Sequence, residues 1–214
     1  MPAHLQAPHE RLVSALRALV GELILVDDGM PSDAAARLAL LARRHDARLL
    51  QLPRNRGKGH AVAAARSALV RRAVPPDALV VVDADGQHPP ETLPPLLAAA
   101  DEAELVIGDR SHDRRAMPVM RRLANGIASG ALSALTGAHI PDSQCGLRVL
   151  RGRALFACEY PPGRYEAETR HLKRCLRAGV SVAWVPIPAV YEGQRSSFRP
   201  MRDGARVLAS VVGG

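Results

Sequence analysis

The chain has 214 residues, a formal net charge of +8 and only 3% aromatic residues. A chain of this length can bury one sizeable core, and no Gly/Ser-rich or Pro-rich linker divides it, so we expect a single domain over residues 1–214. The positive charge indicates an anionic partner. Because basic residues are not interleaved with aromatic ones and no helix-turn-helix or zinc-finger pattern is present, we expect no nucleic-acid partner.

Targeting and redox features predict a cytoplasmic protein. The three cysteines are odd in number and lack metal-ligand spacing, which fits packing residues in a reducing compartment. The N-terminal residues lack the basic and apolar segments of a signal peptide. The longest uncharged stretch, Leu123–Ala138, is short for a bilayer and carries polar residues, so we predict an interior or interfacial helix there.

Along the first half of the chain, aliphatic strands alternate with helices. We predict helices at residues 9–20, 32–45, 57–72 and 92–100, and strands at residues 22–29, 47–52, 78–83 and 104–108. This alternation indicates parallel βαβ units, and therefore an α/β fold with a mostly parallel, Rossmann-like sheet flanked by helices.

Beyond Arg110 the alternation stops. We predict a long helical region at residues 116–136, a short strand at 144–150, a helix at 165–179, a strand at 180–191 and a final helix near 201–212. We expect this half to complete a site on the first half instead of forming a separate domain.

A pair of carboxylates ends one predicted strand, in the segment LVVVDADGQHPPE at residues 79–91. The strand has no polar face, so it is expected to be covered on both sides, and its carboxyl end opens onto the crevice where open α/β sheets bind ligands. Asp83, Asp85 and Gln87 offer hard oxygen ligands that suit Mg²⁺ or Mn²⁺. The alternative is a solvated strand end. We expect His88 to form a hydrogen bond within this loop, with metal binding as the alternative.

Two further segments lie where strands end. Asp27 and Asp28 stand at the end of the first predicted strand, either as part of a turn or as acceptors for a base or ribose. The loop at residues 55–59, NRGKG, opens a helix; its glycines, its helix N-terminus and Lys58 suit a phosphate. It lacks the Walker spacing, so a plain helix-opening loop is the alternative.

Taken in order, six segments resemble family 2 glycosyltransferases of the GT-A fold, and within them most closely the polyprenyl-phosphate (dolichyl-phosphate) mannose and glucose synthases. The segments are VDDG, NRGKG, VVVDADGQHPPE, VIGDR, DSQCGLRVLRG and RYEAETRHLKRCLRAGVSVAWVPIPAVYEGQRSSFRP. The resemblance covers about Pro2 to Arg206 and implies a donor-binding half at about residues 1–110 and an acceptor-side half at about residues 111–214.

The resemblance also implies roles for individual residues on the donor side. Asp28, with Asp27 beside it, would contact the nucleotide base, and Lys58 would lie near the nucleotide. One further set of residues would hold the divalent ion against the diphosphate, and another would form a loop late in the chain that closes over the donor. These are Asp83, Asp85 and Gln87 for the ion, and Ser196, Ser197 and Arg199 for the loop.

On the acceptor side, Arg110 with Arg121 or Arg122 would hold the acceptor's phosphate. Asp142 matches the acidic position near the acceptor. A lipid monophosphate is already substantially dianionic at neutral pH and needs no general base, whereas a sugar hydroxyl needs one and Asp142 would be the candidate. Capping of a turn is the structural alternative. Glu168 matches a recurrent acidic position, although it could simply face solvent.

The basic cluster of Arg110, Arg114, Arg115, Arg121 and Arg122 suggests that the acceptor's phosphate and an anionic membrane face meet at one edge. For Arg114 and Arg115, a solvated face is the equal alternative. We therefore expect a cytoplasmic enzyme at the inner face of the membrane, held there by peripheral contact or by a separate membrane subunit.

The chain departs from the family pattern at its N-terminus, where Leu5 and Gln6 stand in place of the usual Asn and Glu and no aliphatic strand precedes Met1. We expect a central strand to be missing, which would leave an unpaired edge on the strand that contains ELILV, residues 22–26, and destabilise the fold. A start codon assigned too far downstream would explain it.

The sequence thus predicts an inverting transferase that moves a sugar from a nucleotide-sugar donor, of the GDP-mannose or UDP-glucose type, to a polyprenyl phosphate. The enzyme alternative is a family 2 transferase acting on a sugar hydroxyl in cell-envelope or polysaccharide synthesis. A truncated, inactive homologue is the non-enzyme alternative.

Overall fold

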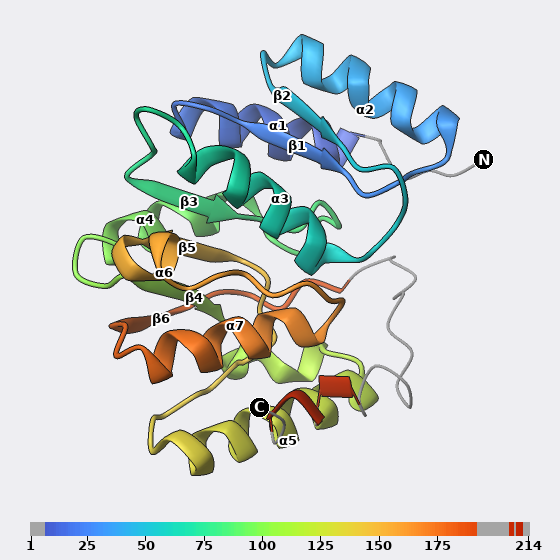
Figure 1. Ribbon diagram of the computed structural model, residues 1–214. Coiled ribbons are helices and arrows are strands. Elements are labelled where there is room, and N and C mark those ends of the chain that lie inside the picture. Colours follow the sequence, from blue (N-terminus) through green and yellow to red (C-terminus); the bar gives the residue numbers. More distant parts are fainter. Residues whose placement is uncertain (1–6, 192–205, 208, 212–214) are drawn as a thin grey trace.

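The computed structural model describes residues 7–191, 206–207 and 209–211 (Figure 1). Most predicted elements are present within a few residues of their expected bounds. In chain order they are α1 (Ala7–Leu19), β1 (Ile24–Asp27), α2 (Ser32–Arg44), β2 (Arg48–Gln51), α3 (Lys58–Val70), β3 (Ala78–Val81), η1 (Pro90–Thr92), α4 (Leu93–Ala99), β4 (Leu105–Asp109), η2 (Ser111–Ala116), α5 (Val119–Thr136), β5 (Arg148–Arg151), α6 (Gly152–Phe156), α7 (Glu166–Arg177) and β6 (Val182–Pro186). The sequence did not predict α6, because five residues are too few to show a helical period.

The strands form two sheets within this part of the chain. β1 pairs with β2 in parallel, and the other four strands follow the order β3-β5-β4-β6. β4 and β6 are parallel, whereas β5 is antiparallel to both of its neighbours. β5 runs backwards because the preceding loop enters the sheet where β4 ends: the amide of Gly108 in β4 donates to the carbonyl of Leu147. The predicted α/β architecture is confirmed, with this reversed strand as an addition.

Strand pairing is interrupted between β1 and β3. Across the described residues, β1 pairs only with β2, β3 pairs only with β5, and no strand lies between them. The unpaired edge expected on the strand ending at Asp27 is therefore present. Helices bridge the interruption, since α3 contacts β1 on one side and α6 and α7 on the other.

Helices cover both faces of the larger sheet (Figure 1). α4 packs on one face against β4, β5 and β6, while α6 packs against β3 and β5 on the same side as α3 and α7. The core between them contains fully buried aliphatic side chains, among them Leu96, Leu105, Ile107 and Leu150. The three cysteines are free and buried, as expected of packing residues. None of the helices in the described ranges is long and apolar enough to cross a bilayer.

Candidate active site

A pocket of about 310 Å³ lies at the carboxyl ends of β1, β3 and β4. This is the edge at which open α/β sheets bind ligands. The pocket brings together most of the site residues predicted from the sequence. These are Asp28, Lys58, Asp83, Asp85, Gln87, Arg110 and Arg121. It also contains four side chains that the prediction did not assign to the site, namely Gln144, Arg164, Tyr165 and Glu168.

The other predicted residues lie elsewhere. Asp27 is buried and accepts a hydrogen bond from the amide of Met30 at 2.7 Å, so its carboxylate closes the turn after β1. Asp142 is fully buried behind Arg110. Arg122 is not among the pocket-lining residues. The predicted donor loop with Ser196, Ser197 and Arg199 falls outside the described residues.

Asp28 joins the end of β1 to the predicted phosphate loop. One carboxylate oxygen accepts from the amide of Arg56 at 2.9 Å and the other from the amide of Gly57 at 2.7 Å. Gly57 has φ of +95°, a conformation that only glycine adopts without strain. The carboxylate thus holds the loop in the shape that presents Lys58 at the start of α3.

Lys58 lies between two carboxylates from distant parts of the chain. Its Nζ is 2.5 Å from Oδ1 of Asp83 and 3.0 Å from Oε1 of Glu168. Burial disfavours the charged forms of Lys58 and Asp83, but their partners together outweigh it. Asp83 and Glu168 raise the pKa of Lys58, and Lys58 and His88 lower that of Asp83. Glu168 is 4% exposed, which corrects the expectation that it could face solvent. His88 Nε2 lies 3.7 Å from Asp83.

The residues predicted to bind metal form an incomplete ligand shell. Asp83 and Asp85 line the same pocket, and Asp85 accepts a hydrogen bond from the amide of Gln87 at 3.0 Å. Within the described residues, no cluster of three or more His, Cys, Asp or Glu side chains has metal-binding geometry. Mg²⁺ keeps waters and takes one or two carboxylates together with substrate phosphates, so this donor set fits Mg²⁺ or Mn²⁺ bound jointly with a diphosphate.

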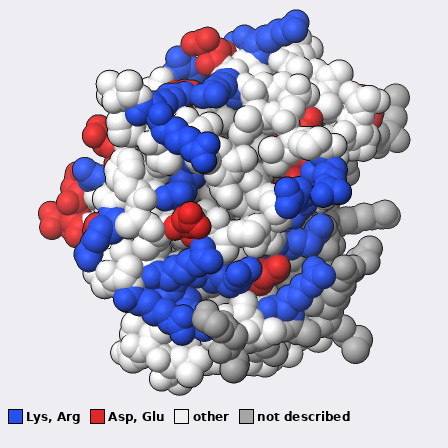
Figure 2. Space-filling view, in the orientation of Figure 1, with Lys and Arg blue, Asp and Glu red and all other residues white. Residues whose placement is uncertain are grey.

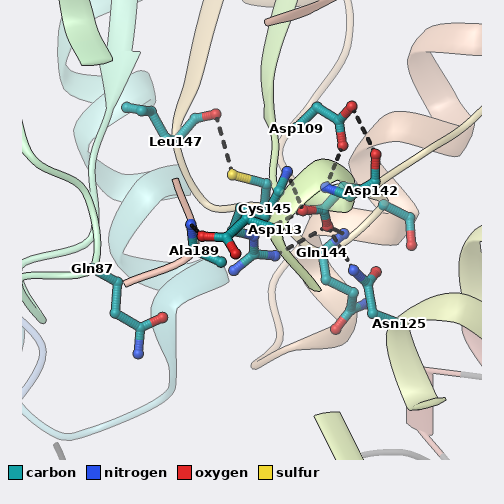
Figure 3. Close-up of polar contacts among 12 residues, drawn as sticks. Gln87, Asp109, Asp113, Asn125, Asp142, Gln144, Cys145, Leu147 and Ala189 are labelled. Atoms are coloured by element: carbon teal, nitrogen blue, oxygen red, sulfur yellow. Dashed lines mark hydrogen bonds and ion pairs between the residues drawn. The ribbon is translucent and has the colours of Figure 1, made fainter. Parts of the chain in front are cut away.

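Arg110 and Asp142 form a buried ion pair with two hydrogen bonds. Nε and Nη2 of Arg110 donate to the two carboxylate oxygens at 2.7 and 3.0 Å. The side chain of Asn125 and the backbone amide of Gln144 also donate to Asp142, at 2.8 and 3.2 Å. Figure 3 shows both residues beside its carboxylate. Burial opposes the charge on Asp142, but the Arg110 guanidinium outweighs it and lowers the pKa of this carboxyl.

Arg121 lies at the pocket wall between two aromatic rings. Its guanidinium carbon is 5.8 Å from the ring centre of Tyr165 and 5.6 Å from that of Tyr191. Its Nη1 donates to the amide oxygen of Gln87 at 3.4 Å. Cation–π attraction to the two rings, together with the Gln87 contact, holds the guanidinium at the pocket wall. Tyr191 also accepts a hydrogen bond from Nη1 of Arg110 at 3.2 Å, so both arginines share this wall.

The sequence model of the family described as glycosyl transferase family 2 matches residues 9–155 of this chain. The chain belongs to that family. It is 33% identical over 138 residues to the undecaprenyl-phosphate 4-deoxy-4-formamido-L-arabinose transferase of Edwardsiella ictaluri, a match that covers 64% of this chain and 41% of the relative. It is also 32% identical over 152 residues to the transferase of the same name from Proteus mirabilis. That match covers 69% of this chain and 45% of the relative. The match thus spans less than half the length of these family members.

Solved structures of low sequence identity share the fold of this family 2 chain. Glucosyl-3-phosphoglycerate synthase from Mycobacterium tuberculosis, in complex with Mn²⁺, UDP and glucosyl-3-phosphoglycerate, superposes with a TM-score of 0.70 at 21% identity, covering 98% of this chain and 75% of that one. Mannosyl-3-phosphoglycerate synthase from Rubrobacter xylanophilus superposes with a TM-score of 0.68 at 19% identity, and the match covers 95% of this chain and 66% of that one. These likenesses confirm the predicted GT-A architecture.

Sequence reasoning missed Asn125 and the two tyrosines beside Arg121. Asn125 and Ser129 are buried polar residues of α5 that lie beside buried Ala128 and Leu132, and they are hydrogen-bonded at 3.2 Å. Polar residues four positions apart inside an apolar helix are a usable signal, because buried polar groups require partners. The tyrosines carry no such signal, since only the fold brings residues 165 and 191 to the same arginine.

Proposed function

We propose that this chain is an inverting glycosyltransferase that moves a sugar from a nucleotide-sugar donor, of the GDP-mannose or UDP-glucose type, to a polyprenyl phosphate. The observation that carries the proposal is the pairing of Asp142 with Arg110 at the wall of the pocket. A carboxylate that is fully buried, held by a guanidinium and lowered in pKa is a poor proton acceptor. A phosphate acceptor needs no such base, because its oxygens are already ionised near neutral pH.

The basic side chains of the wall support an acceptor that carries phosphate. Arg110 and Arg121 both line the pocket, so their guanidinium groups bring positive charge to the place where a phosphate would bind. The Asp142 carboxylate holds Arg110 in place from behind, and Tyr165 and Tyr191 hold Arg121. Attack by the acceptor oxygen on the anomeric carbon, opposite to the diphosphate, would invert that carbon.

The donor would bind along Asp28, the loop that ends at Lys58, and the Asp83–Gln87 segment. Asp83 and Asp85 would hold Mg²⁺ or Mn²⁺, with Gln87 beside them, and when bound the ion supplies positive charge that stabilises the departing diphosphate. The relatives' names support an undecaprenyl-phosphate acceptor and leave the donor of this chain to be measured.

The outer face of α5 supports an acceptor that comes from a lipid surface. Five large apolar side chains of this helix are more than half exposed: Val119, Met120, Leu123, Ile127 and Leu135. The inner face of the same helix carries Arg121 and Asn125. Figure 2 shows Lys and Arg side chains spread over much of one face, in keeping with the net charge of +8. An apolar row beside basic residues suits peripheral contact with an anionic membrane on the cytoplasmic side.

The test measures release of nucleotide from UDP- and GDP-sugars with undecaprenyl phosphate in detergent, with Arg121→Gln as the variant and Arg122→Gln as the matched control. Arg122 is the neighbouring arginine of α5, and it does not line the pocket. We expect Arg121→Gln to raise the acceptor KM by about tenfold or more, because a charged hydrogen-bonding fork is lost, and Arg122→Gln to change it little.

Three results would contradict the proposal in different ways. A larger effect of Arg122→Gln would assign the acceptor's phosphate to the other arginine. Transfer to sugar hydroxyls with no use of undecaprenyl phosphate would favour the alternative enzyme class. Stabilisation of the chain by nucleotide and Mn²⁺ without transfer to any acceptor would identify it as an inactive homologue that retains the donor site.

A further inference from the structure

Four distant segments meet at the ammonium of Lys58. The group lies between Asp83, just beyond β3, and Glu168, in the first turn of α7. Behind it is Gly146, where a Cβ atom would overlap both the Lys58 ammonium and the Asp83 carboxylate. The glycine is therefore required for the ion pair to pack against the backbone that leads into β5.

The two carboxylates differ in how strongly they depend on Lys58. The side chain of Glu168 is 5% exposed, and its Oε2 is buried with no hydrogen-bond partner among the residues that the structure describes. Water cannot solvate this carboxylate, so Lys58 is the counter-charge on which it relies. The side chain of Asp83 is 28% exposed and lines the pocket, so a ligand that enters the pocket can reach it.

We propose that Lys58 is an exchangeable counter-charge for Asp83 and that Glu168 is the positioning residue that makes the exchange possible. In the free protein the two carboxylates share the single positive charge of the ammonium. When a divalent cation binds Asp83, Lys58 stays with Glu168 and releases the Asp83 oxygen that it had occupied. The inference rests on the metal site of the proposed function and adds two residues that control its affinity.

The exchange predicts opposite effects for two substitutions, measured as Mn²⁺ affinity by electron paramagnetic resonance, first on the nucleotide-free protein and again at saturating UDP. Lys58→Met removes the competing cation, so Mn²⁺ should bind about tenfold more tightly. Glu168→Gln leaves Lys58 with Asp83 as its only carboxylate, so Mn²⁺ should bind about tenfold more weakly. Damage to the fold alone would weaken binding in both.

The double variant Lys58→Met/Glu168→Gln separates an electrostatic role from a structural one. The double variant lacks both the competing cation and the carboxylate that anchors that cation. We therefore expect it to regain the Mn²⁺ affinity lost in Glu168→Gln and to bind Mn²⁺ at least as tightly as the wild type. Glu166→Gln makes the same change of charge in the same turn of α7, where no ion pair with Lys58 is formed, and should leave the affinity unchanged. If Lys58→Met does not fold, Glu168→Gln and the double variant still provide the comparison.

The outcomes distinguish this inference from the function on which it rests. If the wild type binds Mn²⁺ and the variants fail to separate in the predicted directions, the exchange of Lys58 is wrong and the metal site stands. If the wild type binds no Mn²⁺ with or without UDP, the metal assignment of the proposed function is wrong, and the exchange is wrong with it.

Discussion

Replacement of Asp142 by Asn should destabilise the protein strongly. Five hydrogen bonds converge on this carboxylate: two from the Arg110 side chain, one from the Arg110 amide, one from Asn125 and one from the amide of Gln144. Asn keeps one acceptor oxygen, but it turns an N–H group toward donors and removes the charge that compensates Arg110. Arg110 is 6% exposed, so it would remain as a buried cation without a counter-charge.

Breaking a buried pair from one side costs about 3–5 kcal/mol, and a protein of this size loses roughly 2–4 °C in Tm per kcal/mol. We therefore expect Asp142→Asn to lower Tm by roughly 6–20 °C. Asp101→Asn is the matched control, because Asp101 pairs with Arg151 at 3.0 Å while its side chain is 78% exposed. Exposed pairs contribute about 0–1 kcal/mol, so the control should shift Tm by only a few degrees.

Urea unfolding of both variants measures the difference directly. A loss below about 1 kcal/mol for Asp142→Asn, equal to that of the control, would refute the buried-pair reasoning. Activity is then compared well below the Tm of the variant. Because Asp142 also holds Arg110, the rates are compared at saturating acceptor. A folded Asp142→Asn protein that then retains much of its transfer rate supports the phosphate acceptor, whereas near-total loss supports base catalysis on a hydroxyl.

Three further substitutions test the buried residues that pack around the site. Gly146→Ala should abolish stabilisation by UDP with Mn²⁺ in a thermal-shift assay, because the added methyl group overlaps the paired Asp83 and Lys58; an unchanged shift would contradict the close packing. Arg148 is fully buried and donates to three backbone carbonyls, so Arg148→Lys, which cannot span all three, should lower the free energy of unfolding by at least ~2 kcal/mol in urea titrations. Burial, followed by the charge of Arg148, lowers the pKa of His171 to about 3, below its value of about 6.5 in the unfolded chain. The unfolded state therefore binds the extra proton between those two values, and stability should fall as pH drops from about 6.5 toward 3, by up to ~1.4 kcal/mol per pH unit. His171→Gln should flatten that slope, and an equal slope in both proteins would assign it to other groups.

The regular elements could be predicted because their signals are local. Helices α2 and α7 were expected at residues 32–45 and 165–179 and lie at Ser32–Arg44 and Glu166–Arg177. The strands are less well predicted. For example, a strand was expected at residues 22–29, and only Ile24–Asp27 form one. A strand forms only where a partner is present, so its bounds depend on pairing that a single segment does not reveal.

The sequence by itself determined which segments become helices and strands, and it placed Asp28 and Asp83 at strand ends, because apolar period and turn chemistry act over a few neighbouring residues. The tertiary structure alone decided which charges pair. Asp142 meets an arginine 32 positions away, and Lys58 pairs both with Asp83 and with Glu168, which is 110 positions from the lysine. The physical reason is burial: a charge removed from water requires whichever partner the fold brings within hydrogen-bonding distance, and that partner is set by packing and not by distance along the chain.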